Sequence, residues 1–267
     1  MNTILVLNFM EYLKTKSDDQ VNRTIIVITP TYLRLARLAD MTRLSQTLMH
    51  IKHLIWIVIE DSVHVSIQVK QLLDRTGLHC FYFAAKRRIG FPRRGWTGRE
   101  AALQFVRKHF AWLGKNAVVY FADDDNSYDI RLFNEYIRNV DKVGVWAVGL
   151  VADNVVEAPK VMNKKVVGWQ TRYAPKRLWG LDMAGFAINL QLFIDNPDAG
   201  WKKTCTDPSP EPCLLKQLKL SWSDLTPFGL ENHSRDVLVW HTKTKSSAKN
   251  VDSYGYNVEV HVHILSY

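Results

Sequence analysis

The sequence predicts an α/β fold with a mainly parallel sheet, because buried strands alternate with amphipathic helices through the first half of the chain. Short β-branched and aromatic runs indicate buried strands, and apolar residues three or four positions apart indicate helices. The predicted strands are 24–29, 54–60, 80–83 and 117–122, and the predicted helices are 34–50, 66–76 and 99–113. Such alternation is typical of βαβ units, whose helices cover both faces of the sheet.

Local features support each element in turn. The first strand reads TIIVIT, and we expect Pro30 to end it because proline lacks a backbone N–H. The helix that follows carries leucine and methionine at helical spacing, and Gly77 ends the next helix. Residues 86–98 are basic and aperiodic, so we expect a loop there. The fourth strand, AVVYFA, ends directly before three consecutive aspartates.

The second half of the chain is less regular and predicts a mixed sheet that packs closely against the first half. Its predicted strands are 145–151, 166–169, 184–190 and 237–240, with 258–265 as an edge strand near the end. We therefore expect a leader or stem remnant at residues 1–22, a globular domain at 23–245 and a tail at 246–267.

Composition limits the functional classes. Of 267 residues, 47% are hydrophobic, which excludes disorder, collagen and coiled coil as descriptions of the whole chain. Lys and Arg number 35 against 26 Asp and Glu, and the net charge of +9 favours an anionic partner: nucleic acid, membrane surface, nucleotide or acidic glycan. Nucleic acid is the weakest of these, because the charge is scattered and no zinc-finger, RNP or helix-turn-helix signature is present.

Cysteines and targeting signals give weaker indications. At least one of the three cysteines lacks a partner within the chain, and Cys205 and Cys213 could pair across a short proline-rich loop. Asn22 and Asn232 begin N-x-[ST] sequons and are candidate glycosylation sites. No run of about 18 apolar residues predicts a transmembrane helix, so we expect a soluble chain or one without its amino-terminal anchor.

The aspartates at 123–125 are the strongest chemical signal. Adjacent carboxylates repel one another, and a bound cation offsets that repulsion. In an extended segment Asp123 and Asp125 point to the same side, whereas Asp124 points elsewhere. Carboxylate oxygens suit Mg²⁺ or Mn²⁺ better than zinc. The alternative is a solvated acidic turn or helix cap, but the position after a buried strand favours a metal and nucleotide site.

A metal held by few carboxylates shares its coordination with substrate phosphates, so we expect cationic side chains nearby. Candidates are Arg93, Arg94 and Arg99 in and after the basic loop, and His241 and Lys243 after the last predicted strand of the domain. The sequence has neither a P-loop nor a G-x-G-x-x-G motif after a strand. A metal and a nucleotide in such an α/β chain indicate nucleotidyl or glycosyl transfer.

Several motifs together carry a specific family resemblance. In chain order they are TPTY at 29–32, RLSQTL at 43–48, Trp56 with Glu60-Asp61, YFADDDNSY at 120–128, VGLV at 148–151, DMAGFA at 182–187 and VLVWHT at 237–242. In this order they resemble the β-1,3-glucuronyltransferases of glycosyltransferase family 43, over about residues 24–245.

The resemblance implies a GT-A-type fold, with a nucleotide and metal half at 23–128 and an acceptor half at 129–245. It implies Mn²⁺-dependent, inverting transfer of glucuronic acid from UDP-glucuronate to the 3-hydroxyl of a terminal galactose. Glu211 matches the catalytic base and Asp125 the metal ligand. The implied donor contacts are Pro30, Tyr32, Asp61, Arg94, Arg99, Asp123, Asp124, His241 and Lys243. The implied sugar contacts on the acceptor side are Glu157, Tyr173, Arg177 and Asp182.

The resemblance also implies a homodimer and a type II Golgi membrane protein with a lumenal catalytic domain. Four departures separate the sequence from the family pattern: Lys243 replaces an arginine, Glu100 an asparagine and Tyr173 a tryptophan, and Pro212-Cys213 stand where serines follow the catalytic glutamate. The proteoglycan linkage region is the expected acceptor. The departures leave open other galactose-terminated glycans of glycoproteins or glycolipids, and a catalytically silent homologue that binds UDP or glycan.

Overall fold

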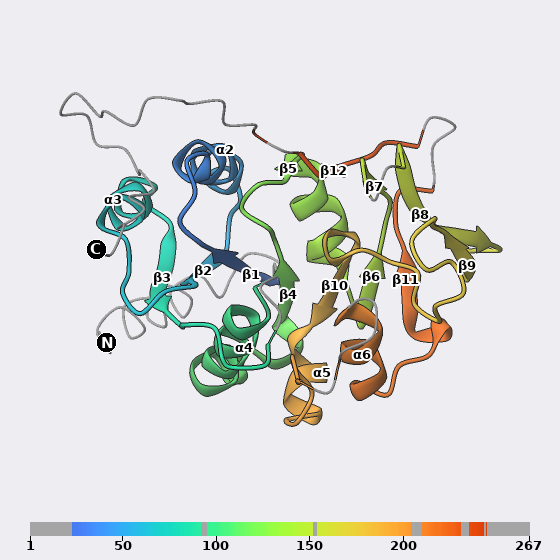
Figure 1. Ribbon diagram of the computed structural model, residues 1–267. Coiled ribbons are helices and arrows are strands. Elements are labelled where there is room, and N and C mark those ends of the chain that lie inside the picture. The colour runs from blue at the N-terminus through green and yellow to red at the C-terminus, as the bar shows by residue number, and fades with distance from the viewer. Residues whose placement is uncertain are drawn as a thin grey trace, which may run out of the picture.

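The computed structural model describes residues 23–91, 95–151, 154–203, 205, 210–230, 235–242 and 244. Its main element is a seven-stranded sheet with strand order β11-β6-β10-β4-β1-β2-β3 (Figure 1). The strands are β1 Thr24–Thr31, β2 Leu54–Glu60, β3 His79–Ala84, β4 Ala117–Phe121, β6 Val143–Val145, β10 Phe186–Asn189 and β11 Leu225–Pro227. β1 to β4 are mutually parallel, and β10 alone is antiparallel to its neighbours β4 and β6. The predicted, mainly parallel α/β sheet is confirmed.

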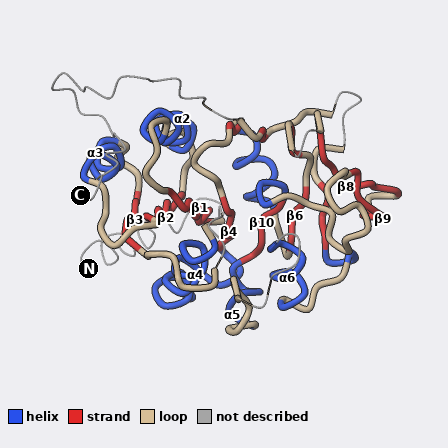
Figure 2. Tube along the Cα trace, in the orientation of Figure 1, coloured by secondary structure: helices blue, strands red, loops and turns tan. Residues whose placement is uncertain are grey.

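Helices cover both faces of this sheet, and each face has its own apolar core (Figure 2). The helices are α2 Arg37–Leu48, α3 Ile67–Arg75, α4 Trp96–Phe110, α5 Leu190–Asp195 and α6 Pro210–Gln217. Short helical turns are Ala111–Asn116, Leu132–Tyr136, Ile137–Asn139, Met183–Gly185 and Trp222–Asp224. Alternate residues of β1 serve the two cores: Ile25 and Val27 pack with α2 and α3, and Ile26 and Ile28 with α4.

A second sheet of five strands, in the order β5-β12-β7-β8-β9, lies beside the main one (Figure 1). Its strands are β5 Ser127–Tyr128, β7 Val148–Gly149, β8 Val156–Met162, β9 Lys165–Gln170 and β12 Val239–Trp240. β12 pairs with β5, which directly follows the aspartates, and with β7. This pairing brings a segment near residue 240 against the segment that follows residue 125.

Two strand predictions were wrong in detail, and further strands were missed. β1 runs through Pro30 to Thr31, because β4 ends opposite Ile28 and leaves no carbonyl that needs the missing N–H of proline. The predicted strand 145–151 is two strands, since β6 ends in the main sheet and β7 belongs to the other. β5, β8 and β11 were not predicted, and β8 and β11 each contain a proline.

Other boundaries and features are as follows. α4 begins at Trp96, three residues before the predicted start. Cys205 and Cys213 form a disulfide, and Cys80 is free. In the part of the chain that the structure describes, no helix is both long and apolar enough to cross a membrane. The predicted strand at 258–265 lies outside the described residues.

Candidate active site

A pocket of about 260 Å³ opens at the carboxyl ends of β1, β2 and β4. Ligand sites gather at this edge in α/β folds, because parallel strands present the loops after them to the same side. The described residues that line it are Pro30, Thr31, Tyr32, Ile59, Asp61, Gly95, Gly98, Arg99, Asp123, Asp124 and Asp125. Seven of the predicted donor-side and metal residues therefore meet in one place.

Each of the three aspartates has a different environment. Asp123 forms an ion pair with Arg99, which is buried at the start of α4, and the Tyr128 hydroxyl donates to the Asp123 carbonyl at 2.9 Å. Asp124 is buried and accepts hydrogen bonds from the Thr31 hydroxyl at 2.6 Å and from Arg34 Nη1 at 2.8 Å. The Asp124 carboxylate therefore lines the pocket and is also held in place by Thr31 and Arg34.

Arg34 links the aspartates to α2. Its second guanidinium nitrogen donates to Asp40 at 2.8 Å, and the Asp40 side chain is almost completely buried. Burial opposes the charge of Arg34, but the carboxylates of Asp124 and Asp40 outweigh it and raise the Arg34 pKa above its ordinary value. Neither Arg34 nor Asp40 was predicted from the sequence, where the only available signal was an arginine shortly after the first strand.

Asp125 is held by its backbone rather than by its carboxylate. Its carbonyl oxygen accepts hydrogen bonds from Arg43 at 2.7 Å and from the Thr242 hydroxyl at 2.5 Å. Burial, followed by repulsion from Asp124 and Asp123, raises the pKa of the Asp125 carboxyl to about 6. A cation would relieve that repulsion, so the donor chemistry fits a divalent metal. No group of three or more His, Cys, Asp or Glu side chains with metal-binding geometry occurs among the described residues.

The rim of the pocket offers a flat ring and a carboxylate. Tyr32 is 55% exposed, and the Arg34 guanidinium lies 5.1 Å from the centre of its ring. Asp61 follows β2, and its Oδ1 accepts the backbone N–H of Arg87 at 3.0 Å. The Tyr32 ring can stack on a planar base, and the Asp61 carboxylate can accept a hydrogen bond from an N–H group of that base. Arg93, Arg94 and Lys243, predicted beside them, lie outside the described residues, as do Asn22 and Asn232.

A second group of side chains centres on Asp182 and His241. His241 Nε2 lies 2.9 Å from Asp182 Oδ1, which also accepts the N–H of Ala184 at 2.9 Å. Burial lowers the pKa of His241, but the Asp182 carboxylate raises it by more. Burial raises the pKa of Asp182, and the hydrogen bond from His241 reverses that effect and lowers it. The donor-side histidine and the acceptor-side aspartate of the prediction thus form one ion pair.

The other predicted acceptor residues gather next to this pair. Glu157 is buried, accepts the Thr171 hydroxyl at 2.6 Å, and lies 3.7 Å from Arg177 Nη2. Arg177 also stands 5.3 Å from the ring centre of Tyr173, which is 41% exposed. Arg177 contributes to the lowered pKa of Asp182, so the acceptor residues and the His241 pair share one electrostatic environment.

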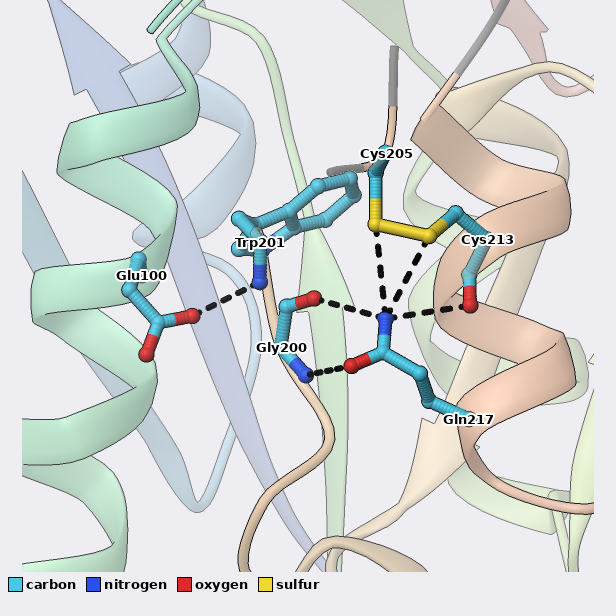
Figure 3. The surroundings of a disulfide bond; sticks show 6 residues. All are labelled: Glu100, Gly200, Trp201, Cys205, Cys213 and Gln217. Atoms are coloured by element: carbon cyan, nitrogen blue, oxygen red, sulfur yellow. Dashed lines mark hydrogen bonds between the residues drawn. A yellow bond between two sulfur atoms is a disulfide. The ribbon is translucent and has the colours of Figure 1, made fainter. Parts of the chain in front are cut away.

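Glu211 lies in the first turn of α6, and its side chain is 6% exposed. It is not one of the described residues that line the aspartate pocket. Two residues later, Cys213 forms its disulfide with Cys205, and the Gln217 side chain lies against both sulfurs (Figure 3). Thr171 and Gln217 were not recognised from sequence, and no local pattern marks either.

Comparison with known proteins identifies the family. Residues 44–245 match glycosyltransferase family 43. The chain belongs to glycosyltransferase family 43. It is 41% identical over 229 residues to human galactosylgalactosylxylosylprotein 3-beta-glucuronosyltransferase 2, covering 83% of this chain and 69% of that protein. It is 38% identical over 239 residues to galactosylgalactosylxylosylprotein 3-beta-glucuronosyltransferase I of Drosophila melanogaster, covering 84% of this chain and 77% of that protein. The family resemblance predicted from the motifs is confirmed.

A solved structure supports the fold of this family 43 glycosyltransferase. Residues 1–349 of S. aureus TarS, crystallised with UDP-GlcNAc, superpose with a TM-score of 0.53. The match covers 84% of this chain and 59% of that chain at 17% identity. The predicted GT-A-type fold is confirmed, and glycosyltransferases of this fold generally use a divalent metal.

Proposed function

We propose that this protein transfers glucuronic acid from UDP-glucuronate to the 3-hydroxyl of a terminal galactose, with inversion at the anomeric carbon and with Mn²⁺. The expected acceptor is the galactosylgalactosylxylosyl-protein named in its relatives. The observation that carries the proposal is the pocket where the three aspartates, Arg99, Tyr32 and Asp61 face one space.

We propose the following roles on the donor side, which this geometry supports. Tyr32 stacks on the uracil ring and Asp61 accepts its N–H, as their exposed positions at the pocket rim allow. Asp123 and Asp124 take the ribose and donor contacts, and Arg99 and His241 face the diphosphate and sugar. When bound at Asp125, Mn²⁺ neutralises the charge that grows on the departing diphosphate. Arg94 and Lys243 are proposed to add positive charge on the same side.

The acceptor side is assigned to Glu157, Tyr173, Arg177 and Asp182. Tyr173 presents a ring face to a sugar, and the charged groups bind its hydroxyls. Glu211 is the general base: it takes the proton of the galactose 3-hydroxyl as that oxygen bonds to C1 and the C1–O bond to UDP breaks.

A direct assay tests the proposal. Purified protein is incubated with UDP-glucuronate, Mn²⁺ and a panel of β-galactosides, and UDP release and product linkage are measured. Glu211→Gln should lower kcat by about 10²- to 10⁴-fold, the usual contribution of general acid–base catalysis. Glu135→Gln, at an exposed position, is the matched control and should leave kcat unchanged. No release of UDP with any acceptor would contradict the transferase activity, and full activity in Glu211→Gln would contradict only the base.

The same panel separates the other candidates. Preference for N-acetyllactosamine or a glycolipid over the linkage-region galactoside would assign a different acceptor. Binding of UDP and Mn²⁺ without turnover would indicate a silent homologue. We further propose that the protein is a homodimer located, as a type II protein, in the Golgi membrane; light scattering and lumenal protease protection of the full-length protein test these two points.

A further inference from the structure

A cluster of polar contacts joins the donor-side helix α4 to α6, which carries Glu211. At the α4 end, Glu100 Oε2 accepts the backbone N–H of Trp201 at 2.7 Å (Figure 3). The contact is so close that a Cβ at Gly200 would lie 2.2 Å from the same oxygen. A side chain at position 200 would therefore displace the Glu100 carboxylate from this position.

At the α6 end, the side-chain amide of Gln217 holds the same segment. Gln217 Nε2 donates to the carbonyl oxygens of Gly200 at 3.0 Å and Cys213 at 3.1 Å, and Gln217 Oε1 accepts the Gly200 N–H at 3.3 Å. The nitrogen also lies 3.5 Å and 3.6 Å from the sulfurs of Cys205 and Cys213. Figure 3 shows the amide between Gly200 and the disulfide.

The middle of the cluster contacts the donor side of the pocket. Trp201 is 1% exposed, and the Arg99 guanidinium lies 5.9 Å from the centre of its ring. Arg99 in turn pairs with Asp123. A continuous set of contacts thus runs from Asp123 and Arg99, through Trp201 and Gly200, to the turn that carries Glu211.

α6 needs such support because it is short. Eight residues form about two turns, and helices of that length are marginal without tertiary contacts. The disulfide fixes Cys213, two residues after Glu211, in the first turn.

We propose that Glu100, Gln217 and the Cys205–Cys213 disulfide form a brace that fixes Glu211 relative to the Arg99 end of α4. They are positioning residues, since none of them needs to touch substrate. The inference rests on the proposed role of Glu211 as the general base. The brace fixes the distance between Glu211 and the donor. Loss of the brace should therefore slow the chemical step and leave donor binding unchanged.

Two variants test the brace by different means. Cys205→Ser/Cys213→Ser removes the covalent link, with Cys80→Ser as the control for a cysteine-to-serine change outside the disulfide. Gln217→Glu keeps the size of the side chain but removes the donor N–H, with Lys216→Ala at the neighbouring exposed position as its control. We expect both brace variants to lower kcat at least tenfold, with the Kd for UDP in Mn²⁺ within twofold of wild type. The controls should match wild type in both quantities.

Hydrogen exchange of the backbone amides from Leu214 to Gln217 gives a readout that does not depend on turnover. Loss of protection there in both brace variants, with α5 amides unchanged, supports the brace even if wild type has no transferase activity, in which case only the proposed function fails. Unchanged exchange overturns the brace, and so does a kcat within twofold of wild type where the wild-type protein is active. An equal loss of UDP affinity and kcat also overturns it, because that pattern indicates general destabilisation.

Discussion

Gly149→Ala is expected to damage the donor site from a distance, through Trp240. A Cβ at position 149 would lie 2.3 Å from Cδ1 and 2.9 Å from Nε1 of the Trp240 indole. Ordinary contact begins near 3.4 Å, so the ring has to move by about 1 Å. Overpacking of this kind costs about 1–3 kcal/mol. His241 follows Trp240, and its backbone N–H donates to the Gly149 carbonyl at 3.0 Å, so the strain reaches the histidine directly.

We therefore expect Gly149→Ala to weaken UDP binding in the presence of Mn²⁺ about 5- to 30-fold. This range corresponds to a loss of about 1–2 kcal/mol of binding free energy, if that much of the strain falls on the UDP-bound protein. Isothermal titration calorimetry measures the Kd, and urea denaturation measures the free energy of unfolding. Gly168→Ala, in β9 of the same sheet, is the matched control, since its Cβ would meet Lys160 Cδ at 3.5 Å, an ordinary contact. The reasoning is refuted if the two variants have the same UDP affinity and the same stability.

Three further outcomes are expected. The Mn²⁺ affinity, measured by calorimetry, should fall about tenfold between pH 7.5 and pH 5.0. Burial, followed by Asp124 and Asp123, raises the pKa of the Asp125 carboxyl to about 6, so below that pH a proton competes with the metal for this carboxylate. A Mn²⁺ affinity that does not change with pH would contradict this. Cys205→Ser/Cys213→Ser should lower the free energy of unfolding by about 2.5 kcal/mol, from the entropy of a nine-residue loop, in urea titrations. The His241–Asp182 pair contributes its full stabilisation below the ordinary histidine pKa of 6.5, and this contribution is lost as the pH rises through the raised pKa of His241 in the folded state. Asp182→Asn should therefore lower the pH midpoint of the His241 titration measured by NMR. An unchanged midpoint would exclude the pairing.

Much of the fold could be predicted because its signals are local. The run LIWIVIE is apolar on both faces, a pattern that is typical of a strand covered by helices on both sides of the sheet. β2 has the predicted bounds. The predicted strand 145–151 failed because both of its parts are apolar, and local pattern cannot reveal that the chain changes sheets between them. β8 was missed because its buried positions are Glu157 and Pro159, whereas Val156 and Met162 are exposed, so its apolar residues do not mark its buried face.

In the candidate site, too, some residues could be predicted from local sequence and others could not. The aspartates and Arg99 were predictable from motif and position, and the pocket brings them together. The partners that fix them were not: Asp124 is held by Arg34, 90 residues earlier in the chain, and Asp125 by Thr242, 117 residues later. Nothing in the spacing of a sequence reports which distant hydrogen bond a side chain makes.

The sequence by itself determined the α/β class, the edge of the sheet that carries the site, and the family, because periodicity, strand ends and ordered motifs are properties of short segments. The tertiary structure alone decided that Asp182 pairs with His241, that Arg34 joins Asp124 to Asp40, and that Glu100, Gln217 and a disulfide meet beside Glu211. Each of these contacts spans elements that packing brings together, and only the packed chain specifies their distances and charges.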